Sequence, residues 1–467
     1  MIEQKKMRFY GLRDLDKGKI PQLEKVSDED LFATKVVSHV LPFRTNNYVV
    51  EELIDWDNVP NDPMYQLTFP QKDMLTDDQF NKIADLLKKD APKEEIDKVS
   101  NEVRFQLNPH PAGQMTANVP TLEDDDEPVQ GVQHKYKETA LIFPSAGQTC
   151  HAYCTFCFRW AQFVGMNDLK FATDESGRFQ KYLKTHKEIT DVLFTGGDPM
   201  IMTLKKLEVY LEPLLQPEFD HIQNIRIGTK SVAYWPYKFV NEKESDGVIA
   251  LLEKLVKAGK HVAIMGHYNH WVELSTEIAQ EAVRRIRATG AEIRAQSPIV
   301  KHVNDDADVW ARMWKDQVRL GIIPYYMFVE RDTGAKNYFE IPLHQAFNLY
   351  RDAYKQVSGL AKTVRGPSMS ALPGKVAVEG ISEINGKKVF LLNFIQARNP
   401  EWLKRPFLAE YDEEATWLNQ LKPAFGDKDF FYREELKHIL EERAQKDHHK
   451  FNEEEEMDDE HLASGAA

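Results

Sequence analysis

The chain has 467 residues, of which 74 are acidic and 60 are basic, and its formal net charge is −14. This acidic balance argues against a general nucleic-acid binder, which normally presents a basic surface. No stretch approaches the roughly 18 consecutive apolar residues of a membrane-spanning helix, and the polar start shows no signal-peptide pattern. We therefore expect no membrane or nucleic-acid partner, and the 42% of hydrophobic residues suffice for one large domain and a smaller one.

Residues 1–130 are predicted to form an N-terminal, mostly helical region. Apolar residues recur at helical spacing over residues 77–89 and 94–104, which predicts two amphipathic helices. Residues 107–128 are rich in proline and acidic residues, so they are predicted to form a surface loop.

Residues 131–360 show a regular alternation of short apolar runs and helical patterns. The apolar runs predict strands at residues 140–143, 192–194, 225–228, 262–265, 293–297 and 325–329. The helical patterns predict helices at residues 204–215, 248–258, 277–288, 308–320 and 343–357. Because strands that alternate with helices form parallel sheets with right-handed crossovers, the predicted fold class is α/β, with a six-unit partial parallel β/α barrel.

The remaining residues are predicted to form a C-terminal α+β extension. An apolar run at residues 389–394 predicts a strand within the region 361–432. Residues 434–445 predict a charged helix, which begins a final segment at 433–467. The acid-rich run after residue 449 predicts a disordered tail.

All three cysteines of the chain, Cys150, Cys154 and Cys157, lie within eight residues. Thiolates are soft ligands that suit iron–sulfur clusters and zinc. A [4Fe–4S] cluster takes four ligands, so three cysteines leave one iron open to a substrate or cofactor. A structural zinc site with His151 or a distant histidine as the fourth ligand is an alternative, as are three unrelated buried thiols. Cysteines gathered for a metal, with none to spare for disulfides, indicate a reducing compartment, and we expect a cytoplasmic protein.

A Gly-Gly-Asp-Pro turn, formed by Gly196, Gly197, Asp198 and Pro199, follows the second predicted strand. The cysteine triplet follows the first predicted strand, so both motifs are expected at strand C-terminal ends, where parallel barrels keep their active sites. A Cys-x-x-x-Cys-x-x-Cys triplet followed by such a turn resembles the radical S-adenosylmethionine superfamily. The resemblance implies that the turn binds the amino group of S-adenosylmethionine.

Further segments resemble the lysine 2,3-aminomutase family over about residues 48–400. They comprise residues 128–136, 157–159, 226–230, 266–270, 296–305 and 324–326. The resemblance implies an isomerase that moves an α-amino group to the β-carbon of an amino acid, using a [4Fe–4S] cluster, S-adenosylmethionine and pyridoxal phosphate. It also implies an external electron donor of the flavodoxin or ferredoxin type and a homo-oligomer. The extra cysteines that give some relatives a zinc site are missing here, so no zinc is expected.

The resemblance also assigns roles to individual residues. Lys375 matches the catalytic lysine that binds pyridoxal phosphate covalently, in a region at 361–432 that closes the site. Arg159 matches the arginine that pairs with the substrate carboxylate. Lys135 replaces a family arginine near pyridoxal phosphate, while Gln296 and His267 match positions near S-adenosylmethionine. The family's run of four glycines before the lysine is reduced here to one, Gly374.

The substrate-binding positions differ from those of the lysine-specific relatives, which hold the distal ammonium of lysine with two aspartates. In this chain the first position falls on Arg331, with Asp332 one place later, and the second falls on Ser368. Residues 364–374 contain no acidic side chain. A pocket with Arg331 and no paired carboxylates predicts a substrate with an acidic or neutral polar side chain. If Asp332 instead faces the substrate, lysine remains the expected substrate.

Two other readings remain open at this point. The shortened glycine run and the missing aspartates would also suit a cluster-binding or S-adenosylmethionine-binding regulatory protein that has lost catalysis. A radical S-adenosylmethionine enzyme without pyridoxal phosphate is the other reading, and the role of Lys375 decides it.

Overall fold

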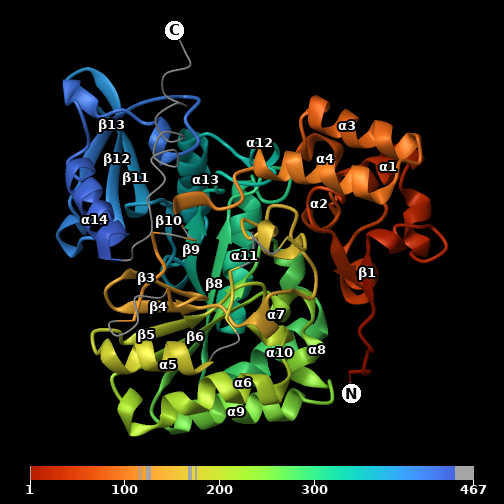
Figure 1. The fold of residues 1–467 in the computed structure, drawn as a ribbon, viewed down its shortest axis with the longest axis horizontal. Coiled ribbons are helices and arrows are strands. Elements are labelled where there is room, and N and C mark those ends of the chain that lie inside the picture. The colour runs from red at the N-terminus through yellow and green to blue at the C-terminus, as the bar shows by residue number, and fades with distance from the viewer. Residues whose placement is uncertain are drawn as a thin grey trace.

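The computed structural model describes residues 2–113, 115, 117–122, 128–166, 171–173 and 176–446. Its centre is an eleven-stranded sheet, with strands in the order β13-β12-β11-β10-β9-β8-β7-β6-β5-β4-β3. In Figure 1 the N-terminal helices lie on one side of the molecule, and the C-terminal strands of this sheet lie with α14 on the opposite side. The predicted acidic tail after residue 449 lies outside the described residues.

The middle of the sheet is parallel and follows chain order, as the alternating pattern predicts. The strands β4 to β9 each pair in parallel with the next one along the chain. Their bounds are β4 (Thr139–Ile142), β5 (Asp191–Phe194), β6 (Asn224–Thr229), β7 (His261–His267), β8 (Glu292–Pro298) and β9 (Ile323–Phe328). All six predicted strands are therefore confirmed, while closure into a six-unit partial barrel remains a prediction.

A seventh parallel strand, β10 (Arg365–Ser370), pairs with β9 and was not predicted. Its sequence, Arg-Gly-Pro-Ser-Met-Ser, contains a glycine and a proline and lacks the apolar run that marks the other strands. Pairing with β9 on one side and with β11 on the other therefore holds this segment in the sheet.

Helices alternate with the parallel strands. They are α6 (Leu204–Leu211), α9 (Ser245–Lys257), α10 (Glu277–Ala288), α11 (Ala307–Leu320) and α13 (Leu343–Lys355). The helix α10 shows why they form: the Thr276 side chain accepts a hydrogen bond from the Ala279 N–H at its start. Ile278 and Ile286 are buried on one face, and Gly290, with a φ of +89°, ends the segment. The sequence did not predict four other helices of this region, namely α5 (Ser176–Thr185), α7 (Ser231–Tyr234), α8 (Tyr237–Val240) and α12 (Lys336–Phe339).

The N-terminal region contains the helices α1 (Asp28–Val37), α2 (Pro63–Thr68), α3 (Asp77–Lys88) and α4 (Lys93–Phe105). The helices α3 and α4 confirm the two predicted from spacing. A small antiparallel sheet of β1 (Phe9–Gly11) and β2 (Arg44–Asn46) was not predicted, because three-residue strands carry too little pattern to detect. This region contributes to the functional site, as shown below.

The C-terminal region continues the central sheet. The strands β11 (Gly374–Ile384), β12 (Lys387–Ala397) and β13 (Phe407–Glu410) are antiparallel and extend it beyond β10. The predicted strand at residues 389–394 is the middle of β12, and α14 (Arg433–Lys446) confirms the charged helix. At the opposite edge, β3 (Val132–Tyr136) pairs antiparallel with β4.

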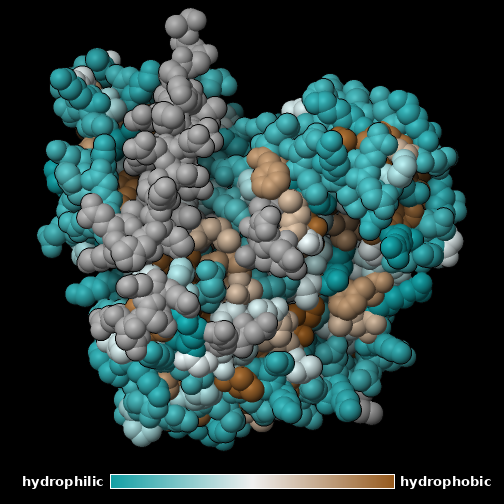
Figure 2. All heavy atoms as spheres, in the orientation of Figure 1, coloured by the Kyte–Doolittle hydropathy of each residue, from teal (hydrophilic) through white to brown (hydrophobic). Residues whose placement is uncertain are grey.

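On the face seen in Figure 2 the described surface is mostly hydrophilic, with hydrophobic side chains scattered singly or in small groups. Within the described part of the chain, no helix combines the length and the apolar character needed to cross a membrane.

Candidate active site

The cysteine triplet lies on the loop that follows β4, and the N-terminal region holds this loop in place. The Tyr153 N–H donates a hydrogen bond to the Arg44 carbonyl on β2 at 2.8 Å. The Thr155 N–H donates to the Leu67 carbonyl on α2 at 2.9 Å. Asn46 Nδ2 donates to the carbonyl of a third loop residue, His151, at 3.0 Å. The N-terminal region is therefore a structural part of the site, a role that the sequence did not indicate.

The three thiols are free and partly buried. Burial raises the pKa of Cys154 to about 11 and that of Cys157 to about 12, and it raises the pKa of Cys150 well above its ordinary value. Among the described residues, no three His, Cys, Asp or Glu side chains gather closely enough to hold one metal ion. The thiols that bind a cluster each take a different iron, so they need not meet at a single point.

His151, the candidate fourth ligand of a zinc site, is already engaged elsewhere. Its Nδ1 lies 2.8 Å from the Ser231 hydroxyl, and the side chain is buried. Burial, with Lys238 and Arg44 nearby, lowers the pKa of His151 to about 3, so the ring is neutral. This hydrogen bond directs the ring toward the start of α7, which follows β6.

The glycine-rich turn after β5 packs directly against the start of the cysteine loop. A Cβ added at Gly197 would lie 2.5 Å from the Thr149 backbone nitrogen, so no side chain fits there. Gly196 has a φ of +130°, and a Cβ there would lie 2.1 Å from Gln148 Nε2. The Asp198 N–H donates to the Thr149 carbonyl at 2.8 Å. The two motifs, 46 residues apart between Cys150 and Gly196, therefore form one unit.

The carboxylate of Asp198 is occupied by protein donors. It accepts hydrogen bonds from the Thr229 hydroxyl at 2.6 Å, and from the Lys230 N–H and the Ser231 hydroxyl, both at 2.9 Å. It also accepts from the Met200 N–H at 2.9 Å. The side chain thus ties the turn to the loop after β6, and cofactor binding by Asp198 stays a prediction.

His267 and Gln296 lie side by side at the C-terminal ends of β7 and β8, where they are paired across the two strands. The His267 ring stacks on Phe156 of the cysteine loop, with centroids 5.7 Å apart. His267 Nε2 is buried and has no hydrogen-bond partner. Burial lowers the pKa of His267 well below its ordinary value, so this nitrogen belongs to a neutral ring. An unpartnered buried nitrogen beside the cysteine loop suits a bound ligand.

A cavity of about 200 Å³ brings four of the predicted residues together. Lys135, Arg159, Arg331 and Lys375 all line it, although they are spread over more than 200 residues of the chain. The described lining includes a fifth cation, Arg226, and contains no aspartate or glutamate. Because Arg159 lies two residues after Cys157, the cavity adjoins the cysteine loop.

Lys375 is placed to act as a nucleophilic amine. It opens β11, and its Nζ donates to Oε1 of its cross-strand partner Gln396 at 3.0 Å. The Nζ also lies 4.0 Å from the Tyr326 ring centroid. Burial, with Arg226 and Arg365 nearby, lowers the pKa of Lys375 to about 7. A substantial fraction of neutral amine is therefore present at neutral pH, as covalent catalysis requires.

The single glycine before this lysine has a steric reason. A Cβ added at Gly374 would lie 2.3 Å from the Gln396 backbone oxygen, so β11 and β12 meet too closely for a side chain. Gly374 is the glycine that remains of the family's longer run, and it sits where the strands require one.

The other cations of the cavity are held close to one another. Lys135 Nζ donates to the Ala371 carbonyl. Burial, with Arg398, Arg331 and Lys375 nearby, lowers the pKa of Lys135 well below its ordinary value. The Arg159 guanidinium lies 4.3 Å from the Phe143 ring centroid. Apart from the pairing of Arg226 with Asp191, this positive charge has no acidic partner within the described lining, which is costly, and anionic ligands would offset the cost.

Arg331 and Asp332 lie differently with respect to the cavity. Arg331 lines it, and its Nε is buried without a hydrogen-bond partner. Asp332 is not among the lining residues, and its Oδ1 is likewise buried without a partner. The guanidinium, rather than the neighbouring carboxylate, therefore faces the cavity.

Arg226 and Gln396 line the cavity but were not predicted as site residues. Arg226 belongs to a quoted family segment, and its Nε pairs with Asp191 Oδ1 at 2.7 Å. Its alternation with buried Ile225 and Ile227 was the available signal that it faces inward on β6. Gln396 gave no signal, because its role depends on the pairing of β11 with β12.

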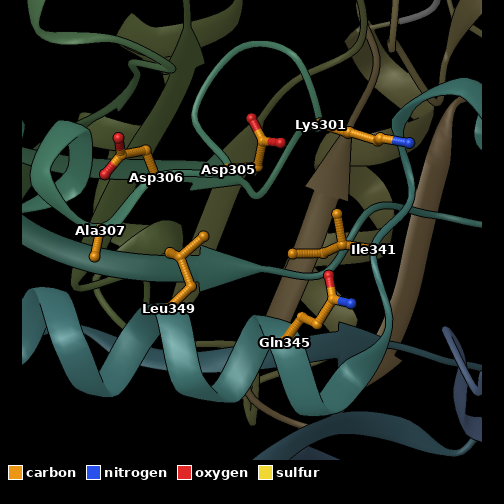
Figure 3. A pocket seen from close by; sticks show the side chains of 7 residues that line it. All are labelled: Lys301, Asp305, Asp306, Ala307, Ile341, Gln345 and Leu349. Carbon is orange, nitrogen blue, oxygen red and sulfur yellow. The ribbon is translucent and has the colours of Figure 1, made fainter. Parts of the chain in front are cut away.

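A second, more open depression of about 390 Å³ lies elsewhere (Figure 3). It is lined by Lys301, Asp305, Asp306, Ala307, Ile341, Gln345 and Leu349, none of which was predicted to bind a ligand. Asp306 is already used, since its Oδ1 accepts a hydrogen bond from the Asp308 N–H and caps α11. The cationic cavity, and not this depression, therefore contains the candidate site.

The cysteine triplet and the glycine-rich turn at one edge of a parallel α/β sheet define a radical S-adenosylmethionine superfamily protein. No family model matches the chain. It is 31% identical to a putative L-lysine 2,3-aminomutase of Aquifex aeolicus over 398 residues, which cover 85% of this chain and 92% of that protein. It is 26% identical to an L-lysine 2,3-aminomutase of Fusobacterium nucleatum over 242 residues, 52% of this chain and 53% of that one. The chain belongs to the lysine 2,3-aminomutase family.

Among solved structures, a radical SAM methyltransferase from Sphaerobacter thermophilus aligns with 63% of this chain and 94% of its own. The identity is 12% and the TM-score is 0.35, so this likeness carries no argument about function.

Proposed function

We propose that the protein is a radical S-adenosylmethionine 2,3-aminomutase that moves the α-amino group of an amino acid to its β-carbon. The observation that carries this proposal is the cationic cavity. It combines a lysine of lowered pKa with an arginine that follows the cysteine triplet by two residues. Family membership supports the same reaction.

The cysteine loop fits a [4Fe–4S] cluster with one open iron. Cys150, Cys154 and Cys157 supply three soft ligands, and His151 is engaged with Ser231. The cluster and S-adenosylmethionine, when bound and reduced by an external donor, supply a hydrogen-abstracting radical. The unpartnered Nε2 of His267 lies beside the loop, where it can bind S-adenosylmethionine together with Gln296. The backbone of Gly196 and Gly197 forms the other boundary of this site.

The cavity fits pyridoxal phosphate. When bound, this cofactor supplies the conjugated ring that stabilises an amino group during migration. Lys375 can bind it covalently, because its amine is partly neutral at neutral pH. Lys135 and Arg226 can pair with the phosphate. The Tyr326 ring, 4.0 Å from the Lys375 Nζ, contributes to the burial of this amine.

Arg159 is positioned to pair with the substrate carboxylate, next to the cysteine loop. Arg331 then remains for the substrate side chain, and we assign it to an acidic or neutral polar group. A lysine ammonium would enter a cavity that Arg159 and Arg331 make positive and whose described lining contains no carboxylate. An uncompensated buried charge costs several kcal/mol, enough to reverse a preference between substrates.

The test is a competition among the common amino acids with anaerobically reconstituted protein, read by mass as β-isomers. We expect glutamate or another acidic or neutral polar amino acid to be converted in preference to lysine. No β-isomer from any amino acid, with S-adenosylmethionine still cleaved, would refute the aminomutase proposal. Dominant conversion of lysine would instead refute only the assignment of Arg331.

A further inference from the structure

Tyr234, at the end of α7, lies directly beneath the cysteine loop. Its side chain is fully buried. The Cys154 thiol donates a hydrogen bond to the Tyr234 hydroxyl, with Sγ and Oη 3.7 Å apart. Within the described part of the chain, Cys154 is the one thiol of the triplet that has a side-chain hydrogen-bond partner.

Tyr234 is held through both its backbone and its ring. Asn46 Nδ2 donates to the Tyr234 carbonyl at 3.0 Å and also to the His151 carbonyl, so it links α7 to the cysteine loop. Lys230 Nζ lies 4.5 Å from the Tyr234 ring centroid. The hydroxyl therefore has a defined position relative to the sulfur.

Lys230 is itself anchored as a buried cation. Its Nζ pairs with Glu273 Oε1 at 2.5 Å and donates to Asn269 Oδ1 at 2.9 Å. Both partners belong to the loop after β7. A cation on the face of a phenol ring strengthens the hydroxyl as a hydrogen-bond donor, because it withdraws electron density from the ring.

A metal-bound cysteine carries no proton, so the direction of the hydrogen bond reverses when Cys154 binds iron. The Tyr234 O–H then becomes the donor, and the thiolate sulfur becomes the acceptor. A hydrogen bond to a cluster sulfur favours the reduced state, which carries one more negative charge than the oxidised state.

We infer that Tyr234, backed by Lys230, is a positioning residue that donates a hydrogen bond to the Cys154 thiolate and raises the reduction potential of the cluster. The inference rests on the cluster of the proposed function. It adds to that function a residue that makes the first electron transfer easier, without contact with the amino acid substrate.

The test compares wild-type protein with Tyr234→Phe, both as full-length chains with reconstituted clusters. The substitution removes the hydroxyl and keeps the ring over Lys230. Tyr237→Phe is the matched control, since Tyr237 lies three residues further on and its hydroxyl donates to Glu52 Oε1 at 3.2 Å instead of to a sulfur. The reduced fraction is measured by electron paramagnetic resonance during a potential titration.

For Tyr234→Phe we expect the ratio of reduced to oxidised cluster at a fixed potential to fall about tenfold, the usual effect of a hydrogen bond to a charged group. For a one-electron couple this equals a shift of about 59 mV to more negative potential. The control should keep the wild-type potential. Equal potentials for wild type and Tyr234→Phe, at equal iron content, would overturn the inference.

If Tyr234→Phe does not retain a cluster, the wild type decides the question. After exchange into deuterated water, electron–nuclear double resonance of the reduced cluster should show a deuteron coupled more strongly than a backbone amide at the Cys154-bound iron. Absence of that deuteron overturns the inference. A wild-type protein that takes up no iron–sulfur cluster would instead refute the proposed function.

Discussion

Replacing Lys375 with methionine should stabilise the protein at neutral and acidic pH while it abolishes cofactor attachment. The pKa of this lysine is about 7 in the folded chain, against an ordinary value of 10.5. Below pH 7 the folded state must carry a buried ammonium near Arg226 and Arg365. The difference between the two pKa values corresponds to about 5 kcal/mol. Because the side chain keeps some contact with solvent, we expect about half of this, 2–3 kcal/mol.

The sign of the pH dependence follows from proton binding. Between pH 7 and 10.5 the unfolded chain binds this proton and the folded chain does not, so the stability of the wild type rises with pH over that range. The methionine variant lacks this contribution. Its advantage over the wild type should be largest at and below pH 7 and should disappear as the pH approaches 10.5.

The assay is urea denaturation of the apo-protein at pH 6 and pH 9.5, for the wild type, Lys375→Met and the control Lys387→Met. Lys387 lies exposed on the neighbouring strand β12, so its replacement should change neither midpoint. Borohydride reduction in the presence of pyridoxal phosphate should label the wild type and the control but not Lys375→Met. A variant whose midpoint is no higher than that of the wild type at pH 6 would refute the pKa argument, and equal labelling would refute the attachment site.

Further predictions concern the substrate, the turn, the cluster and the assembly. Arg331→Asp should shift selectivity toward cationic amino acids by at least about tenfold in a competition assay, because it exchanges a repelling charge for an attracting one; unchanged selectivity would place the substrate side chain elsewhere. Gly197→Ala should lower the iron content per chain, because its Cβ would meet the Thr149 backbone, whereas Gly380→Ala, whose Cβ would have no contact closer than 4.0 Å, should not. Iron-replete, anaerobically purified protein should contain iron and no stoichiometric zinc; a colourless zinc protein would contradict the cluster. Light scattering should give a mass above that of one chain, as the family resemblance implies, and a monomer would refute that expectation.

Elements whose signal is local could be predicted from the amino-acid sequence alone. Three cysteines within eight residues predict a soft-metal loop, and the alternation of apolar runs with helical patterns predicts the six parallel strands that the structure shows. Since the C-terminal ends of parallel strands meet at one edge, the order of the motifs also predicted that the cysteine loop and the Gly-Gly-Asp-Pro turn would both lie at that edge. These inferences need only the chemistry of each segment and the regular geometry of the sheet.

The surroundings of those elements depend on contacts between distant segments, which become visible in the folded chain. Lys135, Arg159, Arg331 and Lys375 come from β3, the cysteine loop, the loop after β9 and β11, and no local pattern shows that they share one cavity without a carboxylate. The strand β10 was not predicted because its polar, proline-containing sequence carries no strand pattern. It joins the sheet through its pairing with β9. Backbone hydrogen bonds, which carry no sequence signal, attach the N-terminal region to the cysteine loop. The lowered pKa of Lys375 also depends on the folded chain, because folding buries the amine and brings arginines that are distant in sequence close to it.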